Sequence, residues 1–377
     1  MSDHRAAGDR GRRERTTQRA SQTASQTASQ TASQTASQRS SANVRGGACA
    51  AMRGRYNDHV AAAADTDRRG QGEPSRRDVL RLAALSGGAV CAPRLVAAAP
   101  PKVSSTMTTR LLPRTQEPIP AIGLGTWQAF DVDAAHHAPQ IEVVKQFLAA
   151  GGRVIDSSPM YGRAEAVVGD VLADLGAIGT PFLATKVWTR GKRDGIAQME
   201  QSRRRMRAPR IDLMQIHNLL DWQTHLPVLR EMKHAGAIRY LGVTHYAHAE
   251  FPQIERMMRT EALDFIQIPY NVADRAVEAR VLPAAADTGT GVLVMRPFEE
   301  GALFRRVRGK PLPGWAAELD CTSWAQVFLK FILGHPAVTC PIPATADPAH
   351  LADNMKAGTG RLPDAAQRRA MVAALDA

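Results

Sequence analysis

The chain has 377 residues, enough for roughly two or three average domains or for one large α/β barrel with an appended segment. Its net charge is +12, but residues 1–103 hold 17 of the 48 Lys and Arg against 8 of the 36 Asp and Glu, so +9 of that charge lies in this segment. The remainder is weakly basic and has no basic patch interleaved with aromatic residues, which argues against a nucleic-acid-binding protein.

Residues 1–74 are predicted to be a disordered leader. Large apolar residues are almost absent there, and four copies of SQTA begin at Ser21, Ser25, Ser29 and Ser33. Such a segment cannot bury enough apolar surface to offset the loss of chain entropy. A period of four residues is too short for a solenoid. A misassigned start, with Met52 as the initiator, is an open alternative.

Residues 75–100 are predicted to be an export signal. Arg76 and Arg77 precede the short apolar stretch LAALSGGAVCAP, and small residues follow in VAAAP. Paired arginines ahead of a short apolar segment resemble the twin-arginine type of signal, so we expect export to the periplasm. The apolar stretch of about 12 residues is too short to span a bilayer. The alternative is a cytoplasmic protein in which this segment is an uncleaved amphipathic helix.

Residues 108–377 are predicted to form a (β/α)8 TIM barrel. Helical patterns such as IEVVKQFLAAGG and AEAVVGDVLADLG separate short apolar runs. Eight strands alternating with helices over about 250 residues are typical of this barrel. The connections after the fourth, fifth and seventh strands are expected to be short to moderate. The predicted strands are residues 121–127, 153–158, 182–187, 212–217, 240–245, 265–270, 291–297 and 338–344.

Four polar residues lie at or just after the ends of consecutive predicted strands: Asp156, Tyr161, Lys186 and His217. Taken singly, each has an ordinary structural explanation, such as helix capping for the Asp. In a barrel, however, the carboxyl ends of the strands converge on one mouth, where active sites form. We therefore expect the four side chains to lie together.

These residue types suit proton delivery to a carbonyl oxygen. A tyrosine, with a pKa of about 10, gives up its proton reluctantly, but a nearby ammonium lowers that pKa and a carboxylate keeps the ammonium charged and oriented. Lys186 and Asp156 would do this for Tyr161, while His217 would hydrogen-bond the oxygen. The hydride must come from a cofactor, because no side chain donates one. No metal is needed, and Cys321 and Cys340 form no CxxC pair that would suggest one.

Several motifs in order resemble the aldo/keto reductase family, over about residues 108–377. They are GLGTW at 123–127, Asp-Ser-Ser-Pro-Met-Tyr-Gly at 156–162, TKVW at 185–188, IHN at 216–218, IQIPY around Gln267 and PIPAT...HLADN at 341–354. The resemblance implies NAD(P)H-dependent reduction of a carbonyl group. It also implies that Tyr161 is the general acid/base, that Lys186 and Asp156 tune it, and that His217 orients the substrate.

The resemblance also implies a set of cofactor contacts, with departures from the family pattern. Thr244 and His245 stand where a Ser-Asn pair is common, Met295 where a Tyr often stacks on nicotinamide, and Arg296 is a candidate for the pyrophosphate. Ala344 and His350 replace basic residues of NADP-preferring members, so we expect NADP binding with reduced discrimination against NAD. The helix start after Thr345 is expected to offer backbone N–H groups to a phosphate. The predicted contacts are Gly125, Thr126, Thr244, His245, Gln267, Met295, Arg296, Thr345, His350 and Asn354.

The expected substrate is a small aldehyde or ketone, handled by a monomer. Trp127 and Trp188, beside the first and third strand ends, are predicted to wall its pocket, the alternative being rim packing. Two other functions stay open. One is a cofactor-binding regulatory or sensor barrel with little turnover. The other is an isomerase or aldolase that uses Lys186 as a Schiff-base amine, although an Asp-paired lysine would stay protonated and make a poor nucleophile.

Overall fold

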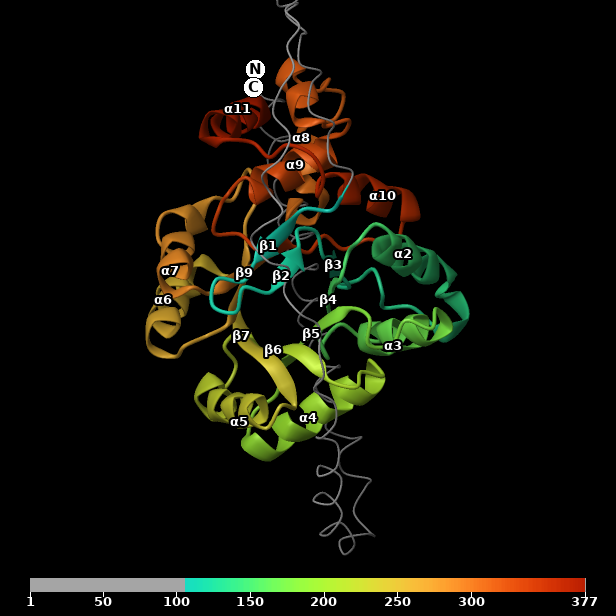
Figure 1. Ribbon diagram of the computed structural model, residues 1–377, viewed down its shortest axis with the longest axis vertical. Coiled ribbons are helices and arrows are strands. Elements are labelled where there is room, and N and C mark those ends of the chain that lie inside the picture. Colours follow the sequence, from blue (N-terminus) through green and yellow to red (C-terminus); the bar gives the residue numbers. More distant parts are fainter. Residues whose placement is uncertain (1–105, 377) are drawn as a thin grey trace, which may run out of the picture. The chain divides into compact units, whose positions relative to one another are not determined.

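Eight parallel strands form a barrel in the computed structural model, which describes residues 106–376 (Figure 1). The predicted leader and export signal lie outside these residues and stay predictions. Each strand overlaps its predicted range, so the (β/α)8 barrel is confirmed. In sheet order the strands are β3 (Leu124–Gly125), β4 (Val154–Asp156), β5 (Phe182–Val187), β6 (Ile211–His217), β7 (Ile238–Thr244), β8 (Phe265–Pro269), β9 (Gly291–Met295) and β10 (Cys340–Pro341).

Helices surround the strands, which explains why the strands are apolar on both faces. All six residues of β5 are buried, for example, including the polar Thr185 and Lys186. The helices are α2 (Ala138–Ala149), α3 (Ala164–Asp174), α4 (Lys192–Arg205), α5 (Trp222–His234), α6 (Phe251–Thr260), α7 (Val281–Thr288), α8 (Ala302–Arg306), α9 (Trp324–Leu333), α10 (Pro348–Lys356) and α11 (Ala365–Asp376). Within the described part of the chain, none of them is long and apolar enough to cross a membrane.

Glycines allow the first and last strands to meet. The backbone N–H of Gly123 donates to the carbonyl oxygen of Pro341 at 2.9 Å, and that of Gly125 donates to Pro343 at 3.1 Å. A parallel bridge between Gly125 and Ala344 continues this seam and closes the barrel. A Cβ atom on Gly125 would lie only 2.6 Å from the carbonyl oxygen of Ile342, so the seam requires a residue without a side chain there.

We expect Gly125→Ala to destabilise the barrel. Forcing a methyl group against a backbone carbonyl is overpacking, which costs about 1–3 kcal/mol in the free energy of unfolding. Urea denaturation followed by circular dichroism measures the change. Gly314→Ala is the matched control, because a Cβ atom there meets nothing within 4 Å. Equal stability of the two variants would contradict this account of the seam.

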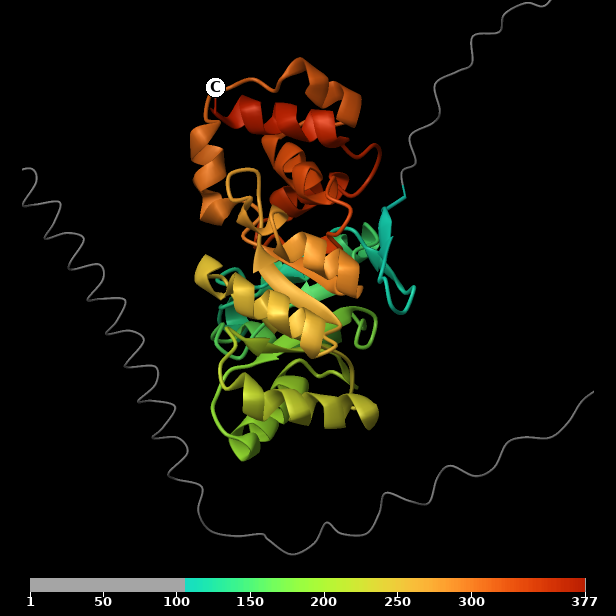
Figure 2. The same cartoon turned by 90° about the vertical axis from the view of Figure 1, so that its left-hand side faces the viewer.

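A β-hairpin that the sequence did not predict covers the amino-terminal end of the barrel. Strands β1 (Thr109–Leu111) and β2 (Pro118–Pro120) pair antiparallel, and Figure 2 shows them projecting from the barrel. Leu112 and Ile119 join an interior cluster whose other members come from the barrel strands and the residue after β10. Those members are Val154, Phe182, Ala184, Leu213, Tyr240, Phe265, Leu293, Cys340 and Ile342.

The connection after β9 is longer than predicted. Residues 296–323 separate β9 from α9 and contain α8 and the 3-10 helix η5 (Gly314–Leu319). The expectation of a short to moderate seventh connection is therefore wrong. Its sequence, rich in Arg, Gly and Pro, has no helical periodicity that would reveal these turns. Helices α8 to α11 gather on one side of the barrel (Figure 1). The remaining 3-10 turns are η1 (Ala134–His136), η2 (His248–Glu250), η3 (Ala276–Glu278) and η4 (Glu299–Gly301).

Candidate active site

The four predicted catalytic residues meet at the carboxyl end of the barrel. Asp156 ends β4, Lys186 is next to last in β5, His217 ends β6, and Tyr161 lies in the connection between β4 and α3. Asp156, Tyr161 and His217 line a cavity of about 860 Å³, and Lys186 lies beneath it in contact with Asp156. The register of the parallel strands thus brings together residues that are up to 61 positions apart.

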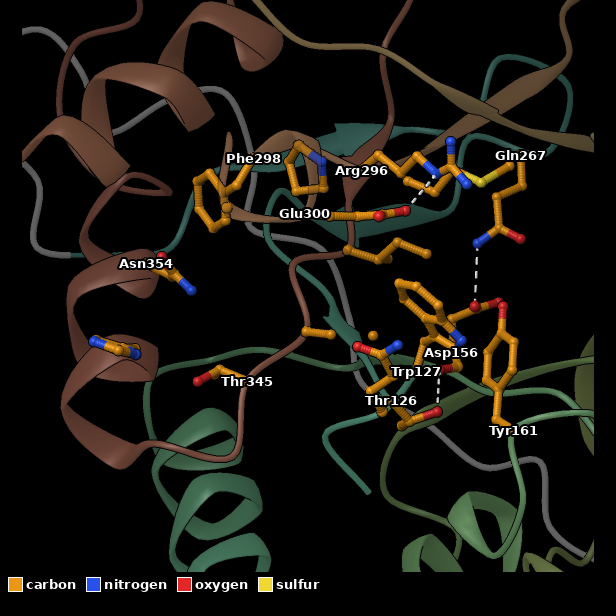
Figure 3. A pocket seen from close by; sticks show the side chains of 18 of the residues that line it. Thr126, Trp127, Asp156, Tyr161, Gln267, Arg296, Phe298, Glu300, Thr345 and Asn354 are labelled. Atoms are coloured by element: carbon orange, nitrogen blue, oxygen red, sulfur yellow. Dashed lines mark hydrogen bonds and ion pairs between the residues drawn. The ribbon is translucent and has the colours of Figure 1, made fainter. Parts of the chain in front are cut away.

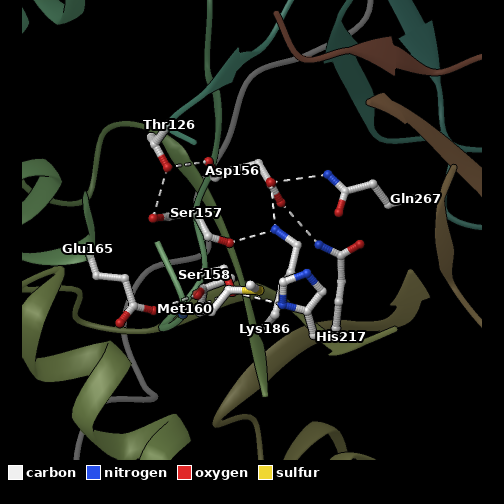
Figure 4. Close-up of polar contacts among 11 residues, drawn as sticks. Thr126, Asp156, Ser157, Ser158, Met160, Glu165, Lys186, His217 and Gln267 are labelled. Carbon is white, nitrogen blue, oxygen red and sulfur yellow. Dashed lines mark hydrogen bonds and ion pairs between the residues drawn. The ribbon is translucent and has the colours of Figure 1, made fainter. Parts of the chain in front are cut away.

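Lys186 and Asp156 form a buried ion pair. The Nζ atom of Lys186 donates to Asp156 Oδ2 at 2.7 Å and to the carbonyl oxygen of Ser157 at 2.6 Å (Figure 4). Burial favours the neutral amine, but the Asp156 carboxylate and Tyr161 outweigh it, so the pKa of Lys186 is raised. A protonated ammonium is a poor nucleophile, which argues against a Schiff-base mechanism.

Tyr161 packs against both Lys186 and His217. The Nζ atom of Lys186 lies 5.0 Å from the centre of the phenol ring, and the His217 ring meets that ring edge to face at 5.9 Å. Burial raises the pKa of Tyr161 and exceeds the opposite effect of the Lys186 ammonium. Lys186 thus acts on this pKa in the predicted direction, but burial, which the prediction did not include, outweighs it. The phenol keeps its proton at neutral pH and can donate it.

His217 is neutral. Burial, followed by the charge of Lys186 and that of His245, lowers the pKa of His217 to about 2. Its Nδ1 atom lies 3.0 Å from the hydroxyl oxygen of Ser158. When that hydroxyl donates to Nδ1, the ring hydrogen sits on Nε2 and is available to a carbonyl oxygen. Ser158 lies in the same sequence motif as Asp156 and Tyr161, so its place beside the cluster was readable from the sequence.

The cavity extends from Tyr161 and His217 to α10, with Thr345 in the segment before that helix and Asn354 in its last turn (Figure 3). Nine of the ten predicted cofactor contacts line it. The exception is His245, whose ring stacks on Tyr246 at 5.4 Å while its Nδ1 atom accepts from the backbone N–H of Ala247. Tyr246 lines the cavity in its place. The lining contacts are Gly125, Thr126, Thr244, Gln267, Met295, Arg296, Thr345, His350 and Asn354.

Gln267 has an amide that fits a nicotinamide ring. Its Nε2 atom donates to Asp156 Oδ2 at 3.1 Å (Figure 3). Its Oε1 atom is buried and has no hydrogen-bond partner among the described residues. A buried unpaired acceptor on the wall of a cavity is matched by an amide N–H of a ligand, such as the carboxamide of a nicotinamide cofactor.

Two aspartates at α10, Asp347 and Asp353, change the predicted phosphate end of the site. The side chain of Asp347 caps α10 by accepting from the backbone N–H groups of Ala349 at 2.7 Å and His350 at 3.3 Å. The expectation that this helix start offers free N–H groups to a phosphate is therefore wrong for these two. Asp347 itself does not line the cavity, whereas Asp353, which was not predicted, does line it and accepts from Ser323 and Gln326.

Aromatic and apolar side chains lie near Asp156, Tyr161, Lys186 and His217, which we call the catalytic cluster. Trp127 lines the cavity with 41 % of its surface exposed. Trp188 rests against the His217 ring at 6.3 Å and is not among the lining residues. Met160, Phe298 and Phe304 also line the cavity, and none of them was predicted. Met160 precedes Tyr161 in the same sequence motif and could have been found there. Phe298 and Phe304 come from the connection after β9, whose length was not predicted.

Arg296 is held at the cavity by two neighbours. Its guanidinium lies over the ring of Tyr246 at 5.1 Å, and its Nε atom lies 3.3 Å from Glu300 Oε1. The predicted contact with a cofactor pyrophosphate is compatible with the position of Arg296. Glu300 already forms an ion pair with this guanidinium, so a bound phosphate would compete with that carboxylate. In the part of the chain that the structure describes, no three His, Cys, Asp or Glu side chains are grouped so as to hold a metal ion.

Comparison with known proteins points to one family. The model of the aldo/keto reductase family matches residues 121–370. The methylglyoxal reductase YeaE of Escherichia coli is 27% identical over 243 residues, covering 63% of this chain and 84% of that protein. The NADH-specific methylglyoxal reductase of Escherichia coli is 27% identical over 234 residues, covering 52% and 68%.

Solved structures of aldo/keto reductases also match this chain. An aldo/keto reductase from Klebsiella pneumoniae, in complex with NADP and acetate, matches with a TM-score of 0.59 and 25% identity over 72% of this chain and 95% of that one. The thermostable aldo-keto reductase Tm1743 matches with a TM-score of 0.60 and 25% identity over 71% of this chain and 100% of that one. The matched segment includes the whole catalytic cluster, and this chain belongs to the aldo/keto reductase family.

Proposed function

We propose that the protein reduces a small aldehyde or ketone to an alcohol with a nicotinamide dinucleotide, and that Tyr161 is the general acid. The observation that carries this proposal is the placement of Tyr161 against His217 and the Lys186–Asp156 ion pair, at one end of a cavity of about 860 Å³. Relatives named as methylglyoxal reductases and a relative complexed with NADP support the same reaction class.

Each residue has a part in the proposed reaction. The bound cofactor would supply the hydride, with Gln267 at its carboxamide and Thr345 and Asn354 toward its other end. The Nε2–H group of His217 orients the carbonyl oxygen and stabilises the charge that develops on it. Tyr161 then gives its proton to that oxygen, and the Lys186 ammonium stabilises the phenolate that remains. Asp156 keeps Lys186 charged and in place.

The test is consumption of NADPH or NADH in the presence of a panel of activated small aldehydes. Steady turnover that depends on Tyr161 supports the reductase. The alternative is a cofactor-binding regulatory or sensor protein, which the replacements at Thr244 and Met295 keep open. That alternative predicts tight cofactor binding without consumption, and a Tyr161→Phe variant that behaves as the original.

The pH dependence of reduction should be flat from about pH 6 to about pH 9. Because the pKa of Tyr161 is raised, the proton donor is lost only as the pH rises above its ordinary value of about 10. Because the pKa of His217 is about 2, this residue stays neutral throughout the range. Alcohol oxidation needs the phenolate and should rise with pH instead. A rate change centred near pH 6.5 that His217→Asn removes would show that His217 titrates during catalysis.

We further propose that the protein binds NADP with little discrimination against NAD, by less than about a hundredfold or roughly 2.7 kcal/mol. Ala344 offers no cation to a 2′-phosphate, and Asp353 adds a carboxylate to the same cavity lining. Ala344→Lys should tighten NADPH binding by about tenfold, through one charge-assisted hydrogen bond, and leave NADH binding unchanged. Titrations followed by quenching of tryptophan fluorescence measure both affinities.

Ala349→Lys is the control for this titration, because it adds the same charge on an exposed face of α10 that does not line the cavity. It should change neither affinity by more than a small factor. A preference for NADP above about a hundredfold in the original protein would contradict the proposal, as would an equal gain from both lysine variants.

A further inference from the structure

Gln215 is a polar side chain in the middle of a buried strand. It lies in β6, where its neighbours Met214 and Ile216 are apolar, and it is itself fully buried. Its Nε2 atom donates to Asp156 Oδ1 at 3.1 Å. Gln215 does not line the cavity, so it is not placed to touch a substrate or a cofactor. Any part it has in the reaction must act through Asp156.

The two oxygen atoms of Asp156 are held by different partners. Lys186 and Gln267 both donate to Oδ2, whereas Gln215 donates to Oδ1. A carboxylate held through one oxygen can turn about its bond to Cβ. A donor on the second oxygen fixes the plane of the carboxylate and so fixes where Oδ2 meets the Lys186 ammonium. Gln215 and Lys186 are paired in the register of β5 and β6, which keeps the two donors side by side.

The Oε1 atom of Gln215 indicates that this residue is not retained for stability alone. Its Oε1 atom is buried and has no hydrogen-bond partner among the described residues. An unpaired buried carbonyl lowers stability, and a leucine or methionine of similar size would avoid that penalty, at the cost of leaving Asp156 Oδ1 without its donor. Residues that break a local packing rule in this way are expected mainly at functional sites.

We propose that Gln215 is a positioning residue, which orients Asp156 and through it the Lys186 ammonium beside Tyr161. The proposal rests on the proposed reductase function. It assigns to β6 a second contribution to the site, in addition to His217 at the end of the same strand.

The test replaces Gln215 with methionine, which keeps the length of the side chain and removes the donor. We expect kcat to fall about tenfold, equivalent to roughly 1.4 kcal/mol, with KM and the cofactor Kd unchanged. The unfolding midpoint should fall modestly, because Asp156 Oδ1 loses its donor. Gln140→Met is the matched control. Gln140 is also buried with an unpaired Oε1 atom, but its Nε2 atom donates to the backbone of Ala129 and not to the catalytic cluster. That control should keep its kcat.

Gln215→Glu provides a second variant with a distinct pH signature. A protonated glutamic acid can donate to Asp156, but a second carboxylate beside the first is repelled. We expect activity close to the original at acid pH and a progressive loss as pH rises, whereas the methionine variant should be impaired at every pH. A methionine variant with unchanged kcat and pH profile overturns the proposal, as does an equal loss in the Gln140→Met control.

A measurement of stability separates this proposal from the reductase proposal. The coupling energy between Asp156 and Lys186 can be obtained from urea unfolding of single and double variants, with and without Gln215→Met. We expect a smaller coupling when Gln215 is replaced. If the original protein shows no turnover, the reductase proposal fails, yet an unchanged coupling would still overturn the role of Gln215 and a reduced one would support its orienting contact.

Discussion

Tyr161→Phe is expected to lower kcat for carbonyl reduction by about 10²- to 10⁴-fold, the usual contribution of a positioned general acid. The change removes the hydroxyl and keeps the ring that packs against His217 and Lys186. Cofactor affinity and the free energy of unfolding should therefore stay near the original values. Stopped-flow or steady-state assays give kcat, and fluorescence titration gives the cofactor Kd.

Tyr240→Phe is the control for this loss. Its hydroxyl donates to Glu117 at the opposite end of the barrel, far from the cavity lining. It should lower the free energy of unfolding by about 1.5–3 kcal/mol, as expected for a hydrogen bond to a carboxylate, and leave kcat nearly unchanged. The two variants thus separate a chemical effect from a structural one. Full activity of Tyr161→Phe would remove this residue from proton transfer and leave the acid role unassigned.

Lys186→Met is expected to lower the free energy of unfolding by about 3–5 kcal/mol as well as to impair turnover. Both members of the Lys186–Asp156 pair are almost completely buried, so the change leaves an uncompensated carboxylate in the interior. Replacing both partners, with Lys186→Met and Asp156→Asn together, should cost less than the sum of the single changes. Urea denaturation of the three variants measures the difference.

An exposed ion pair, Lys192–Glu231, serves as the control for the buried Lys186–Asp156 pair. Lys192 and Glu231 lie 3.4 Å apart with side chains 58% and 67% exposed. Lys192→Met should change the free energy of unfolding by less than about 1 kcal/mol, because water screens such a pair. Similar losses for the two lysine variants would show that the buried pair is not coupled as its geometry indicates.

Local patterns were sufficient to predict the barrel and most of its site. Each strand could be found as an apolar run between amphipathic stretches, and the barrel rule then placed Asp156, Lys186 and His217 at one mouth. The connection after β9 was not predictable in this way. It has no helical period, yet it supplies Phe298, Glu300 and Phe304 to the cavity.

The role proposed for Gln215 could not be predicted from the sequence, although the residue itself is unusual there. A glutamine inside a buried strand is unusual in the sequence, but only the fold shows that its amide reaches Asp156, 59 positions away. Asp347 is a similar case. Its place before α10 is typical of a helix cap, yet its effect on a cofactor phosphate depends on where the cavity ends.

The sequence by itself determined the order of the elements and which polar groups form the candidate active site, because both depend on short-range periodicity and on chemistry that each side chain carries. The tertiary structure alone decided the protonation of those groups. Whether the pKa of Tyr161 rises or falls depends on the balance between burial and the charge of Lys186, and that balance is set by residues that only folding brings together.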